Sequence, residues 1–179
     1  MKKAITILLS LCTFILVLTA CGQKTAKLTG EWTDNQYTIA EIGMQVTLPE
    51  DFAVLDAETV QSEFGYDAKD FYRFVARNEN KKQLLTCFVL PAKKTDATAY
   101  LEKTVENLTA IRESISAITD AEIAGFSFKT VSSTMTNDEG IAMQEQCYVY
   151  QTDGKLICFD YSCRADETQN FDTMLTKLS

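Results

Sequence analysis

Apolar and polar residues alternate along much of the chain after residue 36, and the period of this alternation predicts strands joined by short turns. Gly43 to Pro49 alternates with period two and stops at the proline, as a strand does before a turn. Residues 71–77 and 83–90 flank the polar stretch 78–82, which predicts a hairpin loop. The second of these strands is nearly all apolar, which indicates burial on both of its faces.

More strands are predicted farther along the chain. Residues 123–128 predict a tight turn into a strand at 129–135. Residues 143–151 and 155–163 flank Asp153-Gly154. Because Asp-Gly between two alternating apolar runs is a strong hairpin signal, these two segments are expected to pair as antiparallel strands.

Two segments have a helical period instead. After Pro91, Thr95 or Asp96 can cap a helix whose apolar residues recur on one face: Ala97, Leu101, Val105, Leu108 and Ile111. Near the C-terminus, Asp166 with Gln169 resembles a capping box. It precedes an i, i+3, i+4, i+7 stripe formed by Phe171, Met174, Leu175 and Leu178. The order of strands, helix, strands and helix predicts an α+β fold, an antiparallel β-sheet flanked by amphipathic helices.

The first 21 residues have the pattern of a signal peptide. Lys2 and Lys3 form a basic start, and an apolar run interrupted only by three hydroxyl residues leads to Leu18-Thr19-Ala20-Cys21. These last four residues resemble the bacterial lipobox. The resemblance implies cleavage before Cys21 and acylation of its thiol, which makes Cys21 the mature N-terminus and the only site residue expected.

Two other interpretations of this segment are less consistent with its residues. Ordinary secretory cleavage favours small residues in an A-x-A-like arrangement, and Leu18 stands where the first small residue should be. An uncleaved transmembrane anchor needs about 20 apolar residues, whereas this run is short and ends at Cys21. Lipidation is therefore the favoured interpretation.

The chain divides into three expected parts. Residues 1–20 are the lipoprotein signal peptide, 21–35 the lipidated N-terminus with a flexible tether, and 36–179 a single globular α+β domain. Trp32 is the discordant residue in the tether. It would either enter the membrane interface or pack on the edge of the domain, and packing is favoured because an isolated tryptophan usually serves to bury apolar area.

The predicted domain resembles the Mog1/PsbP-like fold, an α/β/α sandwich found in small bacterial lipoproteins. The resemblance rests on the order of elements and on an opening in which Tyr37-Thr38-Ile39 precedes residues 42–50, a Gly-apolar strand ending in Pro49. It implies a protein that binds partners or assists assembly. It transfers no ligand residue, cofactor or metal to this chain.

Charge and composition limit the partners and the catalytic groups that this chain can use. The 179-residue chain has a formal charge of −8, which becomes −10 once Lys2 and Lys3 leave with the signal. This acidity disfavours nucleic acid as a partner. Histidine is absent, which excludes Ser-His-Asp and Cys-His nucleophile systems and His-ligated zinc.

Carboxylates remain as candidate catalytic groups. Six of them cluster after the first strand: Asp51, Asp56, Glu58, Glu63, Asp67 and Asp70. A pair could act as acid and base, but a solvated acidic face is the simpler interpretation because nothing marks an acid with a raised pKa. Asn137-Asp138-Glu139 lacks calcium-loop spacing and is interpreted as a plain turn.

Four cysteines remain besides Cys12 in the signal and Cys21, namely Cys87, Cys147, Cys158 and Cys163. No C-x-x-C spacing is present, so a zinc site or redox dithiol has little support. A two-residue turn at Asp153-Gly154 places Cys147 and Cys158 on one face as diagonal neighbours, with Cys163 on the other. Diagonal positions are slightly too distant for a disulfide, so buried thiols are favoured, although export would permit disulfides.

The sequence thus predicts a non-enzymatic binding or accessory lipoprotein, anchored through acylated Cys21 on the extracytoplasmic face of a bacterial cell membrane. Its partners would be membrane lipid and an envelope protein or small ligand. An envelope assembly factor or chaperone, and a carboxylate-dependent hydrolase, stay as alternatives. Core and cross-strand packing explains most of six aromatic residues that could otherwise line a groove: Tyr66, Phe71, Tyr72, Tyr148, Tyr150 and Tyr161.

Overall fold

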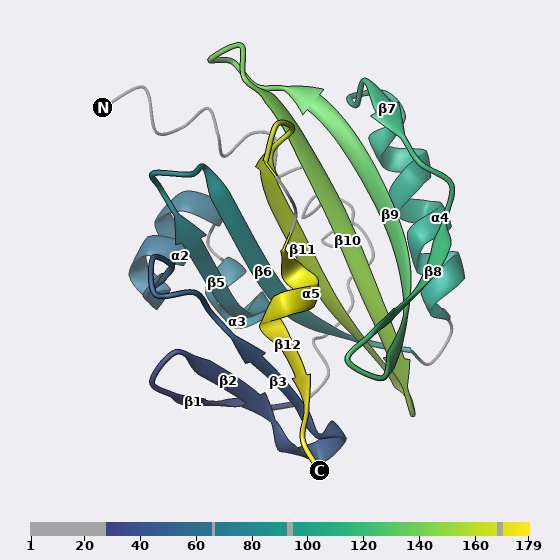
Figure 1. Cartoon of the computed structure of the whole chain (residues 1–179). Coiled ribbons are helices and arrows are strands. Elements are labelled where there is room, and N and C mark those ends of the chain that lie inside the picture. The colour runs from purple at the N-terminus through teal and green to yellow at the C-terminus, as the bar shows by residue number, and fades with distance from the viewer. Residues whose placement is uncertain (1–27, 66, 93–94, 168–169) are drawn as a thin grey trace.

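The computed structural model describes residues 28–179 apart from 66, 93–94 and 168–169, and it consists mainly of two antiparallel sheets (Figure 1). The larger sheet has the order β4-β5-β6-β11-β10-β9-β7, and β8 also pairs with β9. Its strands are β4 (Ala53–Val54), β5 (Tyr72–Asn78), β6 (Gln83–Pro91), β7 (Ser114–Ile115), β8 (Thr119–Ile123), β9 (Phe126–Thr136), β10 (Ala142–Thr152) and β11 (Lys155–Arg164). The smaller sheet comprises, in spatial order, β1 (Glu31–Thr33), β2 (Gln36–Ile39), β3 (Met44–Thr47) and β12 (Leu175–Lys177).

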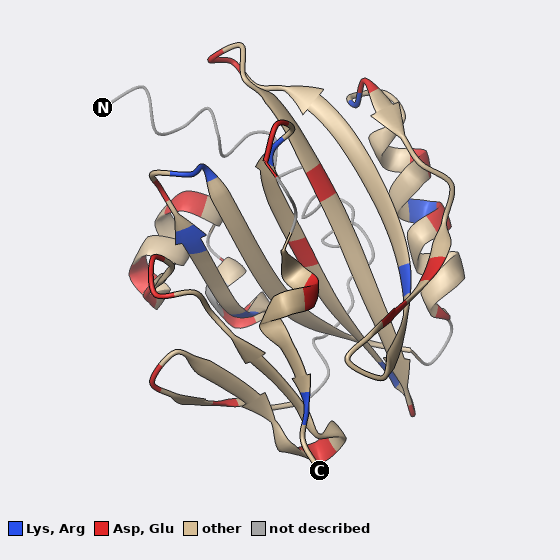
Figure 2. Ribbon diagram, viewed as in Figure 1, with Lys and Arg blue, Asp and Glu red and all other residues tan. Residues whose placement is uncertain are grey.

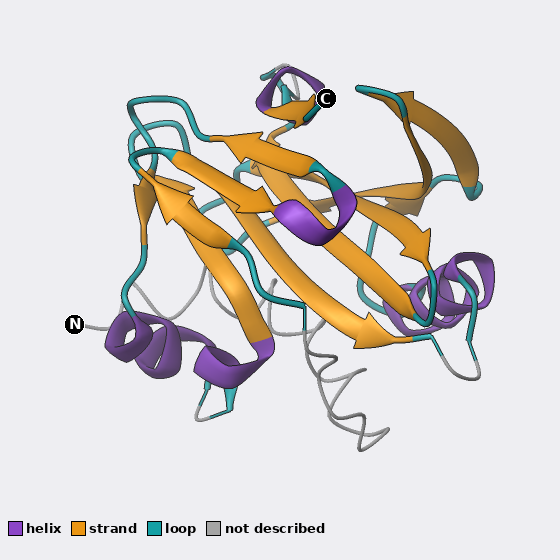
Figure 3. Ribbon diagram, turned by 90° about the horizontal axis from the view of Figure 1, so that it is seen from below, coloured by secondary structure: helices purple, strands orange, loops and turns teal. Residues whose placement is uncertain are grey.

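The helical elements and the smaller sheet cover the two faces of the larger sheet. The helical elements are η1 (Ala40–Ile42), α2 (Ala57–Phe64), α3 (Ala68–Phe71), α4 (Ala97–Leu108) and α5 (Phe171–Met174). Helices α2, α3 and α4 lie on one face, whereas the smaller sheet and α5 lie on the other (Figures 1 and 3). The predicted α+β fold is confirmed, and the layer that completes the sandwich is mainly a second sheet.

The predicted hairpins are present with the expected register. β5 pairs with β6, and Asp153-Gly154 forms the turn between β10 and β11. Val149 lies opposite Cys158 and Cys147 opposite Asp160. Residues 85–90 of β6 are all buried, as expected for a strand that is covered on both faces.

The C-terminal helix that the apolar stripe predicts is only partly correct. A helix forms at Phe171–Met174, but Leu175 begins strand β12 and pairs with Val46 of β3. Leu178 donates its backbone N–H to the Gly43 carbonyl at 2.8 Å and is 40 % exposed. The open edge of β3 supplies hydrogen-bond partners that a longer helix would not use, so tertiary pairing overrides the helical period. Asp166 pairs with Arg164 at 2.9 Å, and Gln169 lies outside the described residues.

The predicted tether to residue 35 is also too long. Residues 21–27 lie outside the described part, but Leu28 is buried and Glu31–Thr33 is strand β1. Trp32 packs against Tyr37 and Phe74 with ring centroids 5.2 and 5.3 Å apart, which confirms that it packs on the domain. Asp34 at φ 53° and Asn35 form the β1–β2 turn, because an Asp-Asn pair suits a two-residue hairpin as well as a polar tether.

Candidate functional site

The predicted lipidation site, Cys21, lies outside the described residues. The described chain begins at Leu28, seven positions later, and Leu28 is already buried in the domain. The Gly30 N–H donates to the Tyr37 hydroxyl at 3.0 Å. In the part of the chain that the structure describes, no helix has the length and apolar character needed to cross a membrane.

Three acids of the cluster after β3 make structural contacts. Asp51 pairs with Lys81 at 2.6 Å, and the Asp56 carboxylate accepts from the Thr59 N–H at the start of α2. Hydrogen bonds to these two carboxylates lower their pKa values, which is the opposite of what a general acid needs. Glu63 forms an ion pair with Arg77 at 2.8 Å. These three acids therefore make structural contacts and are not arranged as an acid and base pair.

Asn137-Asp138-Glu139 is a plain turn, as expected. The Asn137 side-chain oxygen accepts from the backbone N–H groups of Glu139 and Ile141 at 3.0 and 2.9 Å. Within residues 28–179 as described, no group of three or more Cys, Asp or Glu side chains is arranged to hold a metal ion.

All four cysteines of the domain are buried and unbridged. Cys147 and Cys158 face the helices, whereas Cys87 and Cys163 face the smaller sheet. Burial raises the pKa of each of the four thiols. Because the thiolate is the nucleophile and the metal ligand, these protonated thiols are unreactive.

A row of polar groups that the sequence analysis missed crosses the helix-facing side of the central strands. Figure 2 shows one acidic position inside each of the long strands β10 and β11, and these are Glu145 and Asp160. Thr86 of β6 and Cys147 of β10 lie opposite Asp160 on its two sides. The Asp160 Oδ1 and Thr86 Oγ1 atoms are buried and have no hydrogen-bond partner, which is uncommon for buried polar atoms.

The surroundings of Asp160 favour its neutral form. The pKa of Asp160 is raised to about 7, mainly by burial; a hydrogen bond with the Cys147 thiol acts to lower it, and the charge of Glu145 adds to the rise. Glu145 itself pairs with Arg112 at 2.6 Å, and these side chains are 7 % and 1 % exposed. Asp160 is thus a carboxyl group that titrates far above its usual range inside a largely apolar layer.

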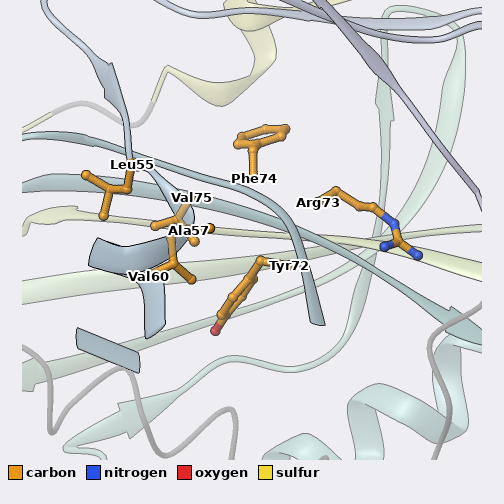
Figure 4. A pocket seen from close by; sticks show the side chains of 7 residues that line it. All are labelled: Leu55, Ala57, Val60, Tyr72, Arg73, Phe74 and Val75. Atoms are coloured by element: carbon orange, nitrogen blue, oxygen red, sulfur yellow. The ribbon is translucent and has the colours of Figure 1, made fainter. Parts of the chain in front are cut away.

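A small cavity of about 140 Å³ opens between α2 and β5. Figure 4 shows its side chains, with Arg73 pointing away from Leu55 and Val60. Arg73 is the extra residue at the register shift between Tyr72 and Phe74, and such bulges redirect side chains. The lining is Leu55, Ala57, Val60, Tyr72, Arg73, Phe74 and Val75. Asp160 is not among these residues, so the cavity and the polar row are separate features.

The aromatic residues that were considered for a ligand groove mostly pack in the core. Phe71 and Tyr72 contact Phe88 on the helix side, and Tyr148 stacks on Phe171 at 4.4 Å on the other. Tyr161 donates its hydroxyl hydrogen to Asn170 at 2.7 Å. Tyr66 lies outside the described residues.

Comparison with known proteins identifies the fold. No family model and no curated protein matches the sequence. The solution structure of a cyanobacterial PsbP, CyanoP from Synechocystis sp. PCC 6803, is similar, with 13 % identity, a TM-score of 0.54, and coverage of 85 % of this chain and 94 % of that one. The chain therefore has a PsbP-like α+β fold, as predicted, and identity this low shows the fold alone.

Two further structures are more distant. LpqN, involved in cell envelope biogenesis of Mycobacterium tuberculosis, has 13 % identity and a TM-score of 0.49, over 76 % of this chain and 83 % of that one. The Saccharomyces cerevisiae Ran-binding protein Mog1p has 13 % identity and a TM-score of 0.44, over 77 % and 78 %.

Proposed function

We propose that this chain is a bacterial lipoprotein in which acylated Cys21 anchors a non-enzymatic binding or accessory domain at the extracytoplasmic face of the cell membrane. The observation that carries the proposal is Leu18-Thr19-Ala20-Cys21 at the end of a complete signal pattern. Each buried CH₂ of a lipid contributes about 0.8 kcal/mol, so two or three acyl chains hold a small domain on a membrane stably.

The start of the fold supports a close attachment. Leu28 is buried only seven positions after Cys21, and seven residues span at most about 25 Å. The domain would thus be held near the lipid surface. The smaller sheet, which begins at Glu31, is the layer nearest the anchor along the chain.

The side-chain chemistry supports binding over hydrolysis. Asp51, Asp56 and Glu63 of the cluster after β3 are used in a helix cap and in ion pairs, and burial raises the pKa of each thiol and keeps it protonated. Asp160 is the acid with the strongly raised pKa, but its Oδ1 atom is buried beside a thiol. A glycosidase-type pair needs a second carboxylate across the substrate, whereas Glu145 is occupied by Arg112.

The chaperone alternative needs an exposed apolar patch. The large exposed hydrophobic residues of the described chain are Val54, Ile111 and Leu178. Val54 is in β4, Ile111 follows α4, and Leu178 follows β12, so they are scattered. Strong binding of a hydrophobic dye by the folded protein would reverse this preference.

The proposal is tested by crosslinking the intact protein in its own cells and identifying the adducts by mass spectrometry. Cys21→Ala should release the protein from the membrane and abolish a specific adduct. Cys12→Ala, which changes a cysteine inside the signal, is the matched control and should leave both unchanged. Membrane retention of Cys21→Ala together with the same adducts would contradict the proposal.

A further inference from the structure

The carboxyl group of Asp160 stands in an environment that suits an uncharged side chain. It belongs to β11, and its helix-facing neighbours Cys158 and Val149 are fully buried in an apolar cluster. Across β6 lies the Thr86 hydroxyl, and both Thr86 Oγ1 and Asp160 Oδ1 are buried without partners. Asp160 is half-buried as a whole residue, but its Oδ1 atom is buried, so a carboxylate there is disfavoured relative to a carboxylic acid.

Of the groups that act on Asp160, the Cys147 thiol lowers its pKa through a hydrogen bond, and this effect is smaller than the effect of burial. β10 contributes the Cys147 thiol and Glu145, and the charge of Glu145 is already balanced by Arg112. On its own strand lies Cys158, and on β6 Cys87 points to the opposite face. Strand β5, on the far side of β6, carries two arginines. Arg77 is held by Glu63 of α2 at 2.8 Å, and Arg73 acts on the Cys87 thiol of the opposite face.

Helix α4 brings one more group to this site. Tyr100 is buried, interacts electrostatically with Asp160 and both helix-facing thiols, and has a raised pKa because of its burial. Its carbonyl accepts from the Thr104 hydroxyl at 3.0 Å. Helix α4 packs on β9 and β10, and Tyr100 shares a buried cluster with Cys147 and Cys158, so Asp160 is linked to this helix through β10 and that cluster.

We propose that Asp160 is a proton-binding site that couples the packing of α4 on the sheet to the pH of the surroundings. With the proton bound, the carboxyl group is neutral and the layer is closely packed. When the proton leaves to solvent, the remaining charge lies beside the apolar cluster that includes Tyr100 and weakens the packing of the helix.

The direction of the pH effect follows from linkage. The pKa of Asp160 is about 7 in the folded chain and about 4 in an unfolded one. Its contribution to stability is therefore fully present below about pH 4 and is lost as the pH rises towards 7. Between pH 5 and pH 8, this group alone should raise the unfolding equilibrium constant about a hundredfold.

The test compares urea unfolding of the purified full-length protein, in detergent where it carries lipid, with that of Asp160→Asn at pH 5 and pH 8. The amide cannot ionise, so the ratio of the wild-type to the variant unfolding constant should rise about a hundredfold between the two pH values. Asp153→Asn is the matched control, because Asn-Gly also suits the β10–β11 turn, and it should follow the wild type. Parallel pH profiles for wild type and Asp160→Asn would overturn the proposal.

A second measurement needs no variant. Carbon-detected NMR of the wild-type protein should show the Asp160 carboxyl titrating near pH 7, with the amide signals of α4 shifting at the same midpoint. A midpoint below pH 5 would overturn the proton site. A midpoint near 7 with an unresponsive α4 would overturn the coupling to the helix.

Discussion

The two faces of the larger sheet are both buried, but they are built from different chemistry. The face towards the smaller sheet is filled by aromatic rings, with Phe171 at the centre of contacts to Tyr148, Phe159 and Phe128. The face towards the helices holds Asp160 and the Arg112–Glu145 pair among its apolar residues. The first face should therefore be insensitive to pH, whereas the packing of the second depends on charge.

The largest expected effect is on the aromatic face. Phe171→Ala removes a fully buried ring and should lower the free energy of unfolding by about 3–5 kcal/mol, measured by urea denaturation. Phe71→Ala, which removes a half-buried ring on the helix side, is the comparison and should cost less. Equal losses would show that the aromatic face is not the main source of stability.

The second effect is on the charged face. Arg112→Met leaves the Glu145 carboxylate buried without its ion pair and should cost about 3–5 kcal/mol. Adding Glu145→Leu in the same chain should recover most of this loss, because an apolar pair of similar volume can replace a buried ion pair. If the double variant were as unstable as the single one, unpaired charge would not be the cause.

A smaller loss of stability is expected at Gly30, and it tests where the folded domain begins. A Cβ atom at Gly30 would lie 2.3 Å from the Tyr37 ring, which is buried. Gly30→Ala should displace this ring and cost about 1–3 kcal/mol, with faster amide exchange in β1 and β2. Unchanged unfolding would mean that residues 28–35 contribute little to the domain.

The smallest effect is expected for a surface pair that belongs to neither face. Lys81→Ala breaks the Lys81–Asp51 contact, in which the side chains are 54 % and 44 % exposed. Water screens such pairs, so the urea midpoint should not change measurably. A shift as large as that of Arg112→Met would mean that exposed charges matter as much as buried ones.

Local signals predicted the central part of the fold well. The Asp153-Gly154 turn set the register of β10 and β11, and with it the faces of Cys147, Cys158 and Cys163. The ends of the chain were predicted less well, because β1 and β12 are three-residue strands that depend on pairing with β2 and β3. Such short segments carry too few residues to show a period.

The polar row was missed for a related reason. Asp160 is the one acidic residue of β11, a strand otherwise buried nearly throughout. An acid inside such an apolar strand is a sequence signal of a buried polar group. Its raised pKa arises only once β6, β10 and α4 surround it, so no local pattern could have shown it.

The account rests most heavily on Cys21. The most direct test is the mass of the N-terminal peptide of the protein isolated from its own cells. We predict a peptide that begins at Cys21 and carries diacylglycerol on its thiol. An unmodified peptide, or one that begins at another residue, would contradict the anchor and the membrane location proposed with it.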